Sequence, residues 1–226
     1  MKKKILGIST VVLLLIAALY FAFSSELGTN AMADIHEKYP DNSIDFDDYS
    51  QSDDPIERSQ GYVKPEPRVF VPPSEESLRQ TQEKVQSFDC AAIEDTSQEE
   101  CEALVALYAS TNGAAWTNNT NWLQSTTIGD WYGVNTLYGG PSGLSLDGNN
   151  LVGTIPPEIG NLKDLMILDL AENFLSGSIP SELMKLDKLG RLELSNNLLS
   201  GSIPPEIGLT SRIWSLSLNN NQLTGQ

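Results

Sequence analysis

The fold of this 226-residue chain is decided by a ten-residue pattern that recurs towards its C-terminal end. The pattern is L-x-L-x-x-N-x-L-x-G, and successive copies begin 24 residues apart. The four copies are LSLDGNNLVG (144–153), LDLAENFLSG (168–177), LELSNNLLSG (192–201) and LSLNNNQLTG (216–225). Self-similarity at a fixed period of about 20–29 residues indicates a solenoid, in which each repeat forms one coil stacked on the next.

Each residue type in the pattern has a structural reason. The two leucines of L-x-L alternate with polar positions, which predicts a short strand with both leucines pointing inward and a parallel neighbour about 4.8 Å away. The asparagine is expected to be buried and to bond backbone groups that would otherwise be unpaired, and the glycine allows a sharp bend. A proline follows isoleucine at Pro156, Pro180 and Pro204, which predicts an extended segment on the convex side, outside the central sheet.

Together these residues resemble the plant-type leucine-rich repeat, L-x-x-L-x-L-x-x-N-x-L-x-G-x-I-P, which is found in receptor ectodomains and secreted inhibitor proteins. The resemblance implies an α/β solenoid over residues 144–226, with a short parallel sheet on its concave face, three full repeats and an incomplete fourth. Met184 departs from the pattern because it replaces a glycine, and residues 208–213 shift the third repeat. Both departures are expected on the convex side, where they affect local packing and not the fold.

Residues 89–143 are predicted to form an N-terminal cap, because the first coil would otherwise expose its core. Ser97 and Glu100 fit a capping box at the start of a helix, and Asn112-Gly113 is expected to end it. The helix has an apolar stripe formed by Leu104, Val105, Leu107 and Tyr108. With the W-x-G-V motif at 131–134, this region is similar to the caps of secreted leucine-rich repeat proteins, especially bacterial and protist ones. We expect Trp116, Trp122 and Trp131 in the core, with ligand stacking as the alternative.

The chain has two cysteines, Cys90 and Cys101. In many relatives cysteines flank the W-x-G-V motif, whereas here Asp130 and Asn135 flank it. In an exported protein an even pair favours a disulfide, and a free, redox-active or metal-binding pair is the alternative. Asn118-Asn119-Thr120 is a glycosylation sequon only in a eukaryotic host.

Residues 1–33 are predicted to be a signal peptide or a membrane anchor. Three lysines precede 19 uncharged residues at 5–23, which as a helix would span roughly 28 Å, about the hydrocarbon thickness of a bilayer. Signal-peptide cores are usually shorter, but Ala31-Met32-Ala33 offers a cleavage site. Both alternatives place residues 34–226 outside the cytoplasm, so the predicted location is extracellular or at the cell surface, with a membrane contact through 5–23 if the helix is uncleaved.

Residues 34–88 are predicted to be an acidic, proline-rich, disordered tether. Residues 34–102 contain 19 acidic and 6 basic residues, and 6 of the 12 prolines fall within 40–73. Apolar residues occur singly there, so little surface could be buried to offset the loss of backbone entropy. A weak calcium site is the alternative for the cluster Asp45, Asp47, Asp48, Asp53 and Asp54, although the EF-hand pattern is not matched.

Charge and composition exclude several function classes. A net charge of -16 argues against a nucleic-acid partner, which needs a basic surface to meet phosphate. The chain has a single histidine, His36, so histidine-dependent nucleophile sites and histidine-rich metal sites are excluded. We predict no catalytic residue, no cofactor and no metal.

The resemblance implies a binding patch on the concave face of the repeats. The candidates are Met166, Asp169, Glu172, Arg191, Glu193 and Trp214. Asp169 and Glu193 should lie about 5 Å apart on adjacent strands, a spacing that retaining glycosidases use, but nothing else supports catalysis. Trp214 beside Arg191 has the composition of a binding hot spot, and the alternative is that it packs against a further coil.

The sequence therefore favours an exported, non-enzymatic recognition module that binds a protein, peptide or glycan. Four short strands offer only about 300 Å², against about 800 Å² per partner in a standard protein interface. The ligand is therefore small, the binding multivalent or the array truncated, and the sequence favours truncation because it stops within a repeat. The alternatives are a structural or adhesive surface protein acting by self-association, and a truncated ectodomain of a receptor or of an enzyme such as a kinase.

Overall fold

The computed structural model describes residues 43–44, 68–137, 139–209 and 212–225. The chain divides into two compact units, Met1–Val71 and Pro72–Gln226. In the first unit, β1 (Ser43–Ile44) pairs antiparallel with β2 (Arg68–Val69). The predicted signal peptide or anchor, the calcium alternative and most of the predicted tether lie outside the described residues. Within the described ranges, no helix has both the length and the apolar character needed to cross a bilayer.

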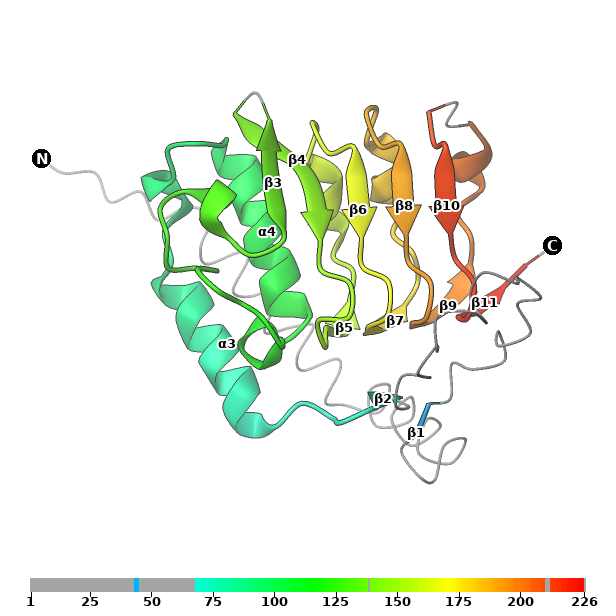
Figure 1. Ribbon diagram of the computed structural model, residues 1–226, viewed down its shortest axis with the longest axis horizontal. Helices are drawn as coiled ribbons and strands as arrows, with labels where there is room; N and C mark the ends of the chain where they lie inside the picture. Colours follow the sequence, from blue (N-terminus) through cyan, green and yellow to red (C-terminus); the bar gives the residue numbers. More distant parts are fainter. Residues whose placement is uncertain (1–42, 45–67, 138, 210–211, 226) are drawn as a thin grey trace, which may run out of the picture. The chain divides into compact units, whose positions relative to one another are not determined.

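The second unit is built around a five-stranded sheet in the order β10-β8-β6-β4-β3 (Figure 1). Its strands are β3 (Val134–Leu137), β4 (Gly140–Ser145), β6 (Ile167–Asp169), β8 (Arg191–Glu193) and β10 (Ser215–Ser217). Strands β4, β6, β8 and β10 are parallel, and β3 adds an antiparallel edge strand to β4. The predicted parallel sheet with one strand per 24-residue repeat is confirmed.

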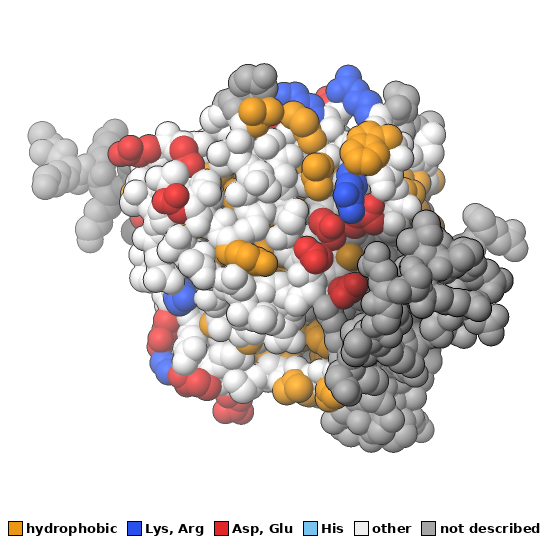
Figure 2. Space-filling model, viewed as in Figure 1, with side chains coloured by type: hydrophobic (Ala, Val, Ile, Leu, Met, Phe, Trp, Pro, Cys, Tyr) orange, Lys and Arg blue, Asp and Glu red, His pale blue; other side chains and the backbone are white. Residues whose placement is uncertain are grey.

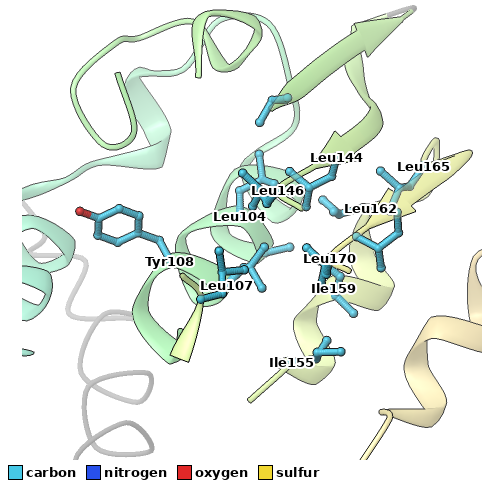
Figure 3. Close-up of a cluster of buried hydrophobic side chains, with 14 of the residues drawn as sticks. Leu104, Leu107, Tyr108, Leu144, Leu146, Ile155, Ile159, Leu162, Leu165 and Leu170 are labelled. Carbon is cyan, nitrogen blue, oxygen red and sulfur yellow. The ribbon is translucent and has the colours of Figure 1, made fainter. Parts of the chain in front are cut away.

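The leucines of the pattern form the core behind this sheet. Leu144, Leu168 and Leu192 pair in register on adjacent strands and are fully buried. Figure 3 shows how leucines and isoleucines of the first two coils meet those of the cap helix, including Leu104 and Leu107. Each such side chain contributes about 1.5–3 kcal/mol of burial free energy, so the repeated leucines hold the coils together.

A second parallel sheet, which the sequence did not predict, follows the buried asparagines. Its strands are β5 (Val152–Thr154), β7 (Phe174–Gly177), β9 (Leu198–Ser202) and β11 (Gln222–Thr224). The 3-10 helices η5 (Pro157–Asn161), η6 (Ser181–Lys185) and η7 (Pro205–Leu209) come next, after the predicted prolines. Met184, which replaces the expected glycine, is partly buried against the core there, so the departure is accommodated by packing.

The buried asparagines connect successive coils. The Nδ2 group of Asn173 donates to the carbonyl oxygens of Leu146 (2.8 Å) and Leu170 (3.1 Å). Its Oδ1 atom accepts from the backbone N–H groups of Asn149 (3.0 Å) and Leu151 (2.9 Å). The expected role of the asparagine is confirmed, because it bonds backbone groups at a turn that no strand pairs.

The cap is organised by α4 (Gln98–Ser110), whose N-terminus has the predicted capping box between Ser97 and Glu100. After the helix, Asn112 adopts a left-handed conformation with φ of 55°. The tryptophans at 116, 122 and 131 are buried and adjoin one another, with ring centroids 4.8 and 5.0 Å apart. Their predicted place in the core is confirmed. The short 3-10 helix η2 (Cys90–Ala92) is joined to α4 by a disulfide between Cys90 and Cys101, whose Cα atoms are 5.7 Å apart.

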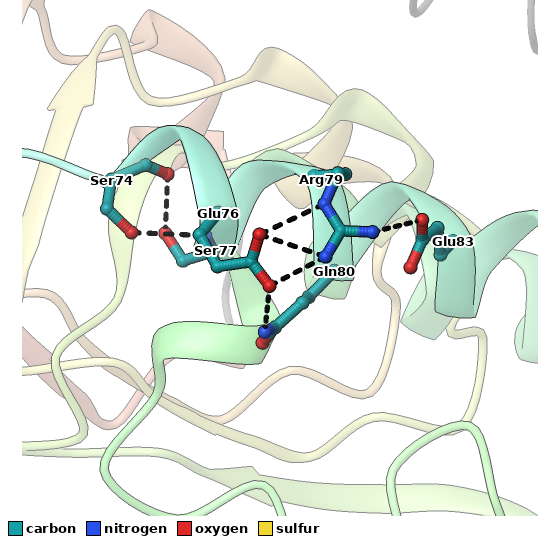
Figure 4. A network of polar contacts seen from close by, with 6 residues as sticks. All are labelled: Ser74, Glu76, Ser77, Arg79, Gln80 and Glu83. Atoms are coloured by element: carbon teal, nitrogen blue, oxygen red, sulfur yellow. Dashed lines mark hydrogen bonds and ion pairs between the residues drawn. The ribbon is translucent and has the colours of Figure 1, made fainter.

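The prediction of a disordered tether is wrong at its C-terminal end, because residues 75–87 form the helix α3 (Glu75–Ser87). Ser74 caps it, and its exposed face has an ion-pair network of Glu76, Arg79 and Glu83 (Figure 4). Its inner face is fixed by Thr81, which is buried and donates to Asn112 Oδ1 (3.1 Å). The helix therefore belongs to the cap, and the acidic composition of the whole stretch concealed it.

Candidate functional site

The solvent-facing side of β4, β6, β8 and β10, which we call the strand face, contains the predicted binding residues. Parallel register places Ser145, Asp169, Glu193 and Ser217 in one row across the strands. A second row consists of Gly143, Ile167, Arg191 and Ser215. In the view of Figure 2, acidic and basic side chains gather over this sheet beside exposed hydrophobic ones.

Arg191 joins the two carboxylates that were considered as a catalytic pair. Its Nε atom donates to Glu193 Oε1 at 3.2 Å, and its Nη2 atom lies 3.7 Å from Asp169 Oδ2. Three of the six predicted residues are therefore in direct contact. The guanidinium offsets the repulsion between carboxylates on adjacent strands.

Glu193 is the least exposed of the three, with 11% of its side chain accessible. Its Oε1 atom also accepts a hydrogen bond from Ser215 Oγ at 2.7 Å. Burial alone would raise the pKa of Glu193, but hydrogen bonds from Ser217 and Ser215 together with Arg191 lower it overall. The carboxylate thus stays ionised and engaged, so it positions Arg191 and is poorly placed to contact a ligand.

The pKa of Asp169 is shifted in the opposite direction to that of Glu193. Burial raises its pKa, and the negative charges of Asp147 and Glu193 act in the same direction. The hydrogen bond from the Ala171 N–H (3.2 Å) and the charge of Arg191 lower the pKa, but they do not outweigh the burial. Two carboxylates with pKa values pushed apart are found in acid–base pairs. Here the carboxylate with the lowered pKa, Glu193, already accepts hydrogen bonds from Arg191 and Ser215.

Trp214 is the most exposed large hydrophobic residue at this face, with 71% of its surface accessible. The indole lies over Gly190: a Cβ atom placed on that glycine would be 2.4 Å from Trp214 Nε1. Only glycine leaves room for this position of the ring. The indole therefore lies over the residue that precedes Arg191, the first residue of β8.

Met166 and Glu172 lie at the margins of the site. Met166 is half-buried, and its carbonyl oxygen accepts from the N–H groups of Gly190 and Arg191. Glu172 is exposed and has φ of 56°, a left-handed conformation that is strained for this residue type. The equivalent positions in the other repeats are occupied by Gly148, Asn196 and Asn220.

Sequence reasoning missed three contributors to this site. Asp147 is exposed and raises the pKa of Asp169, while Ser215 and Ser217 bond Glu193. The 24-residue register could have identified all three, because they lie on or next to the rows that contain the predicted residues. Among the residues that the structure describes, no group of three or more His, Cys, Asp or Glu side chains could hold a metal ion.

Comparison with known proteins gives the following similarities. Residues 142–162, 164–186 and 188–209 match the family model described as Leucine Rich Repeat. The leucine-rich repeat receptor protein kinase EMS1 of Arabidopsis thaliana is 38% identical over 87 residues, which cover 38% of this chain and 7% of EMS1. The PEPR1–AtPEP1 crystal structure aligns with 30% identity and a TM-score of 0.50, covering 57% of this chain and 19% of that one.

The crystal structure of the BIR2 ectodomain of Arabidopsis thaliana aligns with 34% identity and a TM-score of 0.47, over 57% of this chain and 70% of that one. The chain thus spans less than a tenth of the curated relative and about a fifth of the PEPR1 chain.

Proposed function

We propose that this leucine-rich repeat protein, which resembles plant receptor ectodomains, is an exported recognition module that binds an extended peptide on its strand face without bond chemistry. The observation that carries the proposal is Trp214, an aromatic side chain held over Gly190 and left 71% exposed beside Arg191. Exposed tryptophan next to arginine is the composition of residues that dominate binding free energy in interfaces.

The size of the strand face favours a peptide over a folded protein partner. Four strands at about 4.8 Å and three to five residues at about 3.3 Å give roughly 190–320 Å², well below the ~800 Å² that a folded partner covers. An extended segment needs less area, because its side chains can each contact one row of the sheet. The similarity to the PEPR1–AtPEP1 complex and to the receptor kinase EMS1 supports a recognition role.

Export is the second part of the proposal. It rests on the lysines and the uncharged stretch of residues 1–33, as a cleaved signal or a retained anchor, and both place the repeats at the cell surface or outside the cell. The disulfide between Cys90 and Cys101 fits that compartment, since disulfides persist in oxidising environments.

Selection of peptides tests the binding role. The full chain, purified in a mild detergent, is used to select from a random library of linear twelve-residue peptides. We expect the selected peptides to bind the Trp214→Ala variant at least about 30-fold more weakly, which corresponds to the loss of a hot spot of about 2 kcal/mol. The matched control is Ile203→Ala, which removes an exposed apolar side chain that follows β9 of the second sheet.

Two results would contradict the proposal. One is that no peptide is enriched over the input library. The other is that Trp214→Ala and Ile203→Ala weaken binding equally, since the strand face would then have no special role.

Self-association is a second candidate function, favoured by the exposure of Leu216. This residue is 44% exposed, whereas Leu144, Leu168 and Leu192 at the equivalent positions are fully buried. If a second copy covers this residue, analytical ultracentrifugation of the full chain should show dimers that increase with protein concentration. Leu216→Lys should abolish them, and dimers that persist in this variant would exclude the contact.

A further inference from the structure

We infer that the strand face selects peptides that contain a lysine or arginine, whose charge is accepted by Asp147 and Asp169 while Trp214 takes an apolar or basic side chain of the same peptide. This inference rests on the proposed peptide-binding function and specifies the chemical class of the ligand. It is argued from the charge balance of the face, from the hydrogen bonds already made there and from the distance between the two subsites.

The strand face has more carboxylates than cations. Among the described residues, Asp147, Asp169 and Glu193 occupy it or its margin, with Arg191 as their cationic neighbour. The other basic side chains described in the repeats have partners elsewhere. Lys163 pairs with Glu99, Lys188 pairs with Asp164, Lys185 pairs with Glu182, and Arg212 donates to the carbonyl oxygen of Asp187. The face therefore has an excess of negative charge.

Arg191 does not neutralise these carboxylates evenly. Its 3.2 Å hydrogen bond is to Glu193, and its approach to Asp169 is longer, at 3.7 Å. Glu193 is further bonded by Ser215. Asp169 is thus left with the Ala171 N–H (3.2 Å) and this longer ion pair as its partners. The exposed Asp147 lies on the adjacent coil, where the next residue, Gly148, donates to the carbonyl oxygen of Ala171 (3.0 Å), and its negative charge repels that of Asp169. A ligand cation between Asp147 and Asp169 would relieve that repulsion.

Trp214 supplies the second, independent part of the recognition. A flat exposed indole attracts an apolar side chain by burial, and its π-face also attracts the cation of lysine or arginine. The indole and the carboxylates thus favour the same residue types in a ligand. Peptides with several acidic residues would be repelled, because like charges brought together at an interface are costly.

The spacing of the two subsites fits one extended peptide. In the register of the sheet, Trp214 is level with Gly190 and Met166, and Asp169 is three residues further along β6. With strands about 4.8 Å apart and residues about 3.3 Å apart, the indole and Asp169 are separated by roughly 11–14 Å. That separation corresponds to three or four residues of an extended ligand.

The test compares the composition of peptides selected by two forms of the full chain from the same twelve-residue library. We expect lysine and arginine to be enriched at least about threefold over the input with the wild-type chain. The double variant Asp147→Asn/Asp169→Asn should lose that enrichment, and Glu158→Gln should retain it. Glu158 is the matched control, because it is an exposed acid on η5, outside the strand face.

A second measurement does not depend on the folding of any variant. In peptides selected by the wild-type chain, replacing lysine with norleucine or arginine with citrulline should weaken binding at least about tenfold. Raising the salt concentration from 0.05 to 0.5 M should also weaken the binding of the unmodified peptides, because exposed charge pairs are screened.

The outcomes separate this inference from the proposed function. If peptides are selected and need Trp214 but show no basic enrichment, or keep it in the double variant, the inference is wrong and the peptide-binding function stands. Selected peptides that tolerate norleucine or citrulline without loss overturn it in the same way. If no peptide is selected, both the function and the inference fail.

Discussion

Two sets of residues repeat along the solenoid at the same 24-residue spacing, and they behave in opposite ways. The interior set consists of Asn149, Asn173, Asn197 and Asn221, which share one residue type. The last three donate in the same way to a backbone carbonyl of the preceding coil, and Asn149 donates to the carbonyl oxygen of Asn118 in the cap. The strand-face set consists of Ser145, Asp169, Glu193 and Ser217, which differ in size and charge. The interior positions have one structural solution, because buried backbone groups must be paired. The strand-face positions are free to differ, and that freedom makes a specific binding surface possible.

Among the variants that test this contrast, Asn173→Ala is expected to have the largest effect. The substitution leaves the buried N–H groups of Asn149 and Leu151 and the carbonyl of Leu146 without this partner, at a cost of about 1–3 kcal/mol for each unsatisfied group. We expect the free energy of unfolding to fall by about 3 kcal/mol or more, measured by chemical denaturation of the full chain and followed by circular dichroism.

The control for this variant is Asn219→Ala. Asn219 is exposed, and the equivalent position in the second repeat already has Ala171, so the change should stay within about 0.5 kcal/mol. Equal losses in Asn173→Ala and Asn219→Ala would remove the distinction between interior and surface positions.

The second test changes a strand-face position that is constrained by its neighbour. In Gly190→Ala the new Cβ atom would lie 2.4 Å from Trp214 Nε1, so the indole must move. Because the ring is exposed, we expect little loss of stability, about 1 kcal/mol or less, but roughly tenfold weaker binding of the selected peptides. Acrylamide quenching of tryptophan fluorescence should also change, since the other three tryptophans are buried.

Gly208→Ala is the matched control for this test, because nothing lies within 4 Å of a Cβ atom at Gly208. If both glycine variants leave quenching and binding unchanged, the position and binding role of the Trp214 indole do not depend on the space above Gly190.

The interior set is also what the sequence predicted best. The periods of the leucines and asparagines determined the parallel sheet, and the capping box at Ser97 and Glu100 determined the start of α4. The second sheet escaped prediction, because its strands are three to five residues long and have no clear alternation. Helix α3 escaped because its stability depends on a distant partner, Asn112, which bonds Thr81 and Ser77.

The sequence predicted which positions form the candidate site, but it did not predict what each side chain does there. The period placed Asp169, Arg191 and Glu193 side by side, and the structure brings them into contact. It did not indicate that Glu193 would be covered, because that depends on hydrogen bonds from Ser215 in the next coil and from Ser217. Positions follow from periodicity, whereas burial depends on the particular neighbours in adjacent coils.

A third test concerns Glu172, which holds a left-handed conformation where the other repeats have Gly148, Asn196 and Asn220. Asparagine tolerates this conformation better than glutamate. Asn220 Nδ2 also donates to Asn196 Oδ1 at 2.7 Å, a bond that an asparagine at 172 could extend. We expect Glu172→Asn to raise the free energy of unfolding by about 0.5–1 kcal/mol.

The reciprocal variant Asn196→Glu should lower the free energy of unfolding by a similar amount. Both changes are measured by the same denaturation experiment. A loss of stability in Glu172→Asn would show that the interactions of the glutamate outweigh its backbone strain.

The smallest expected effect is electrostatic and concerns two carboxylates of one row. Burial raises the pKa of Asp169 above 3.8, whereas the hydrogen bonds and Arg191 bring the pKa of Glu193 below 4.5 despite its burial. The stability from Asp169 is therefore fully present below about pH 3.8 and is lost as pH rises through its raised pKa. The stability from Glu193 is present above about pH 4.5 and is lost as pH falls through its lowered pKa.

Carboxyl carbon chemical shifts, followed by NMR titration and assigned with Asp169→Asn and Glu193→Gln, measure both pKa values. Shifts in the same direction for both groups would contradict the separate roles assigned to them, with Asp169 facing the ligand and Glu193 holding Arg191.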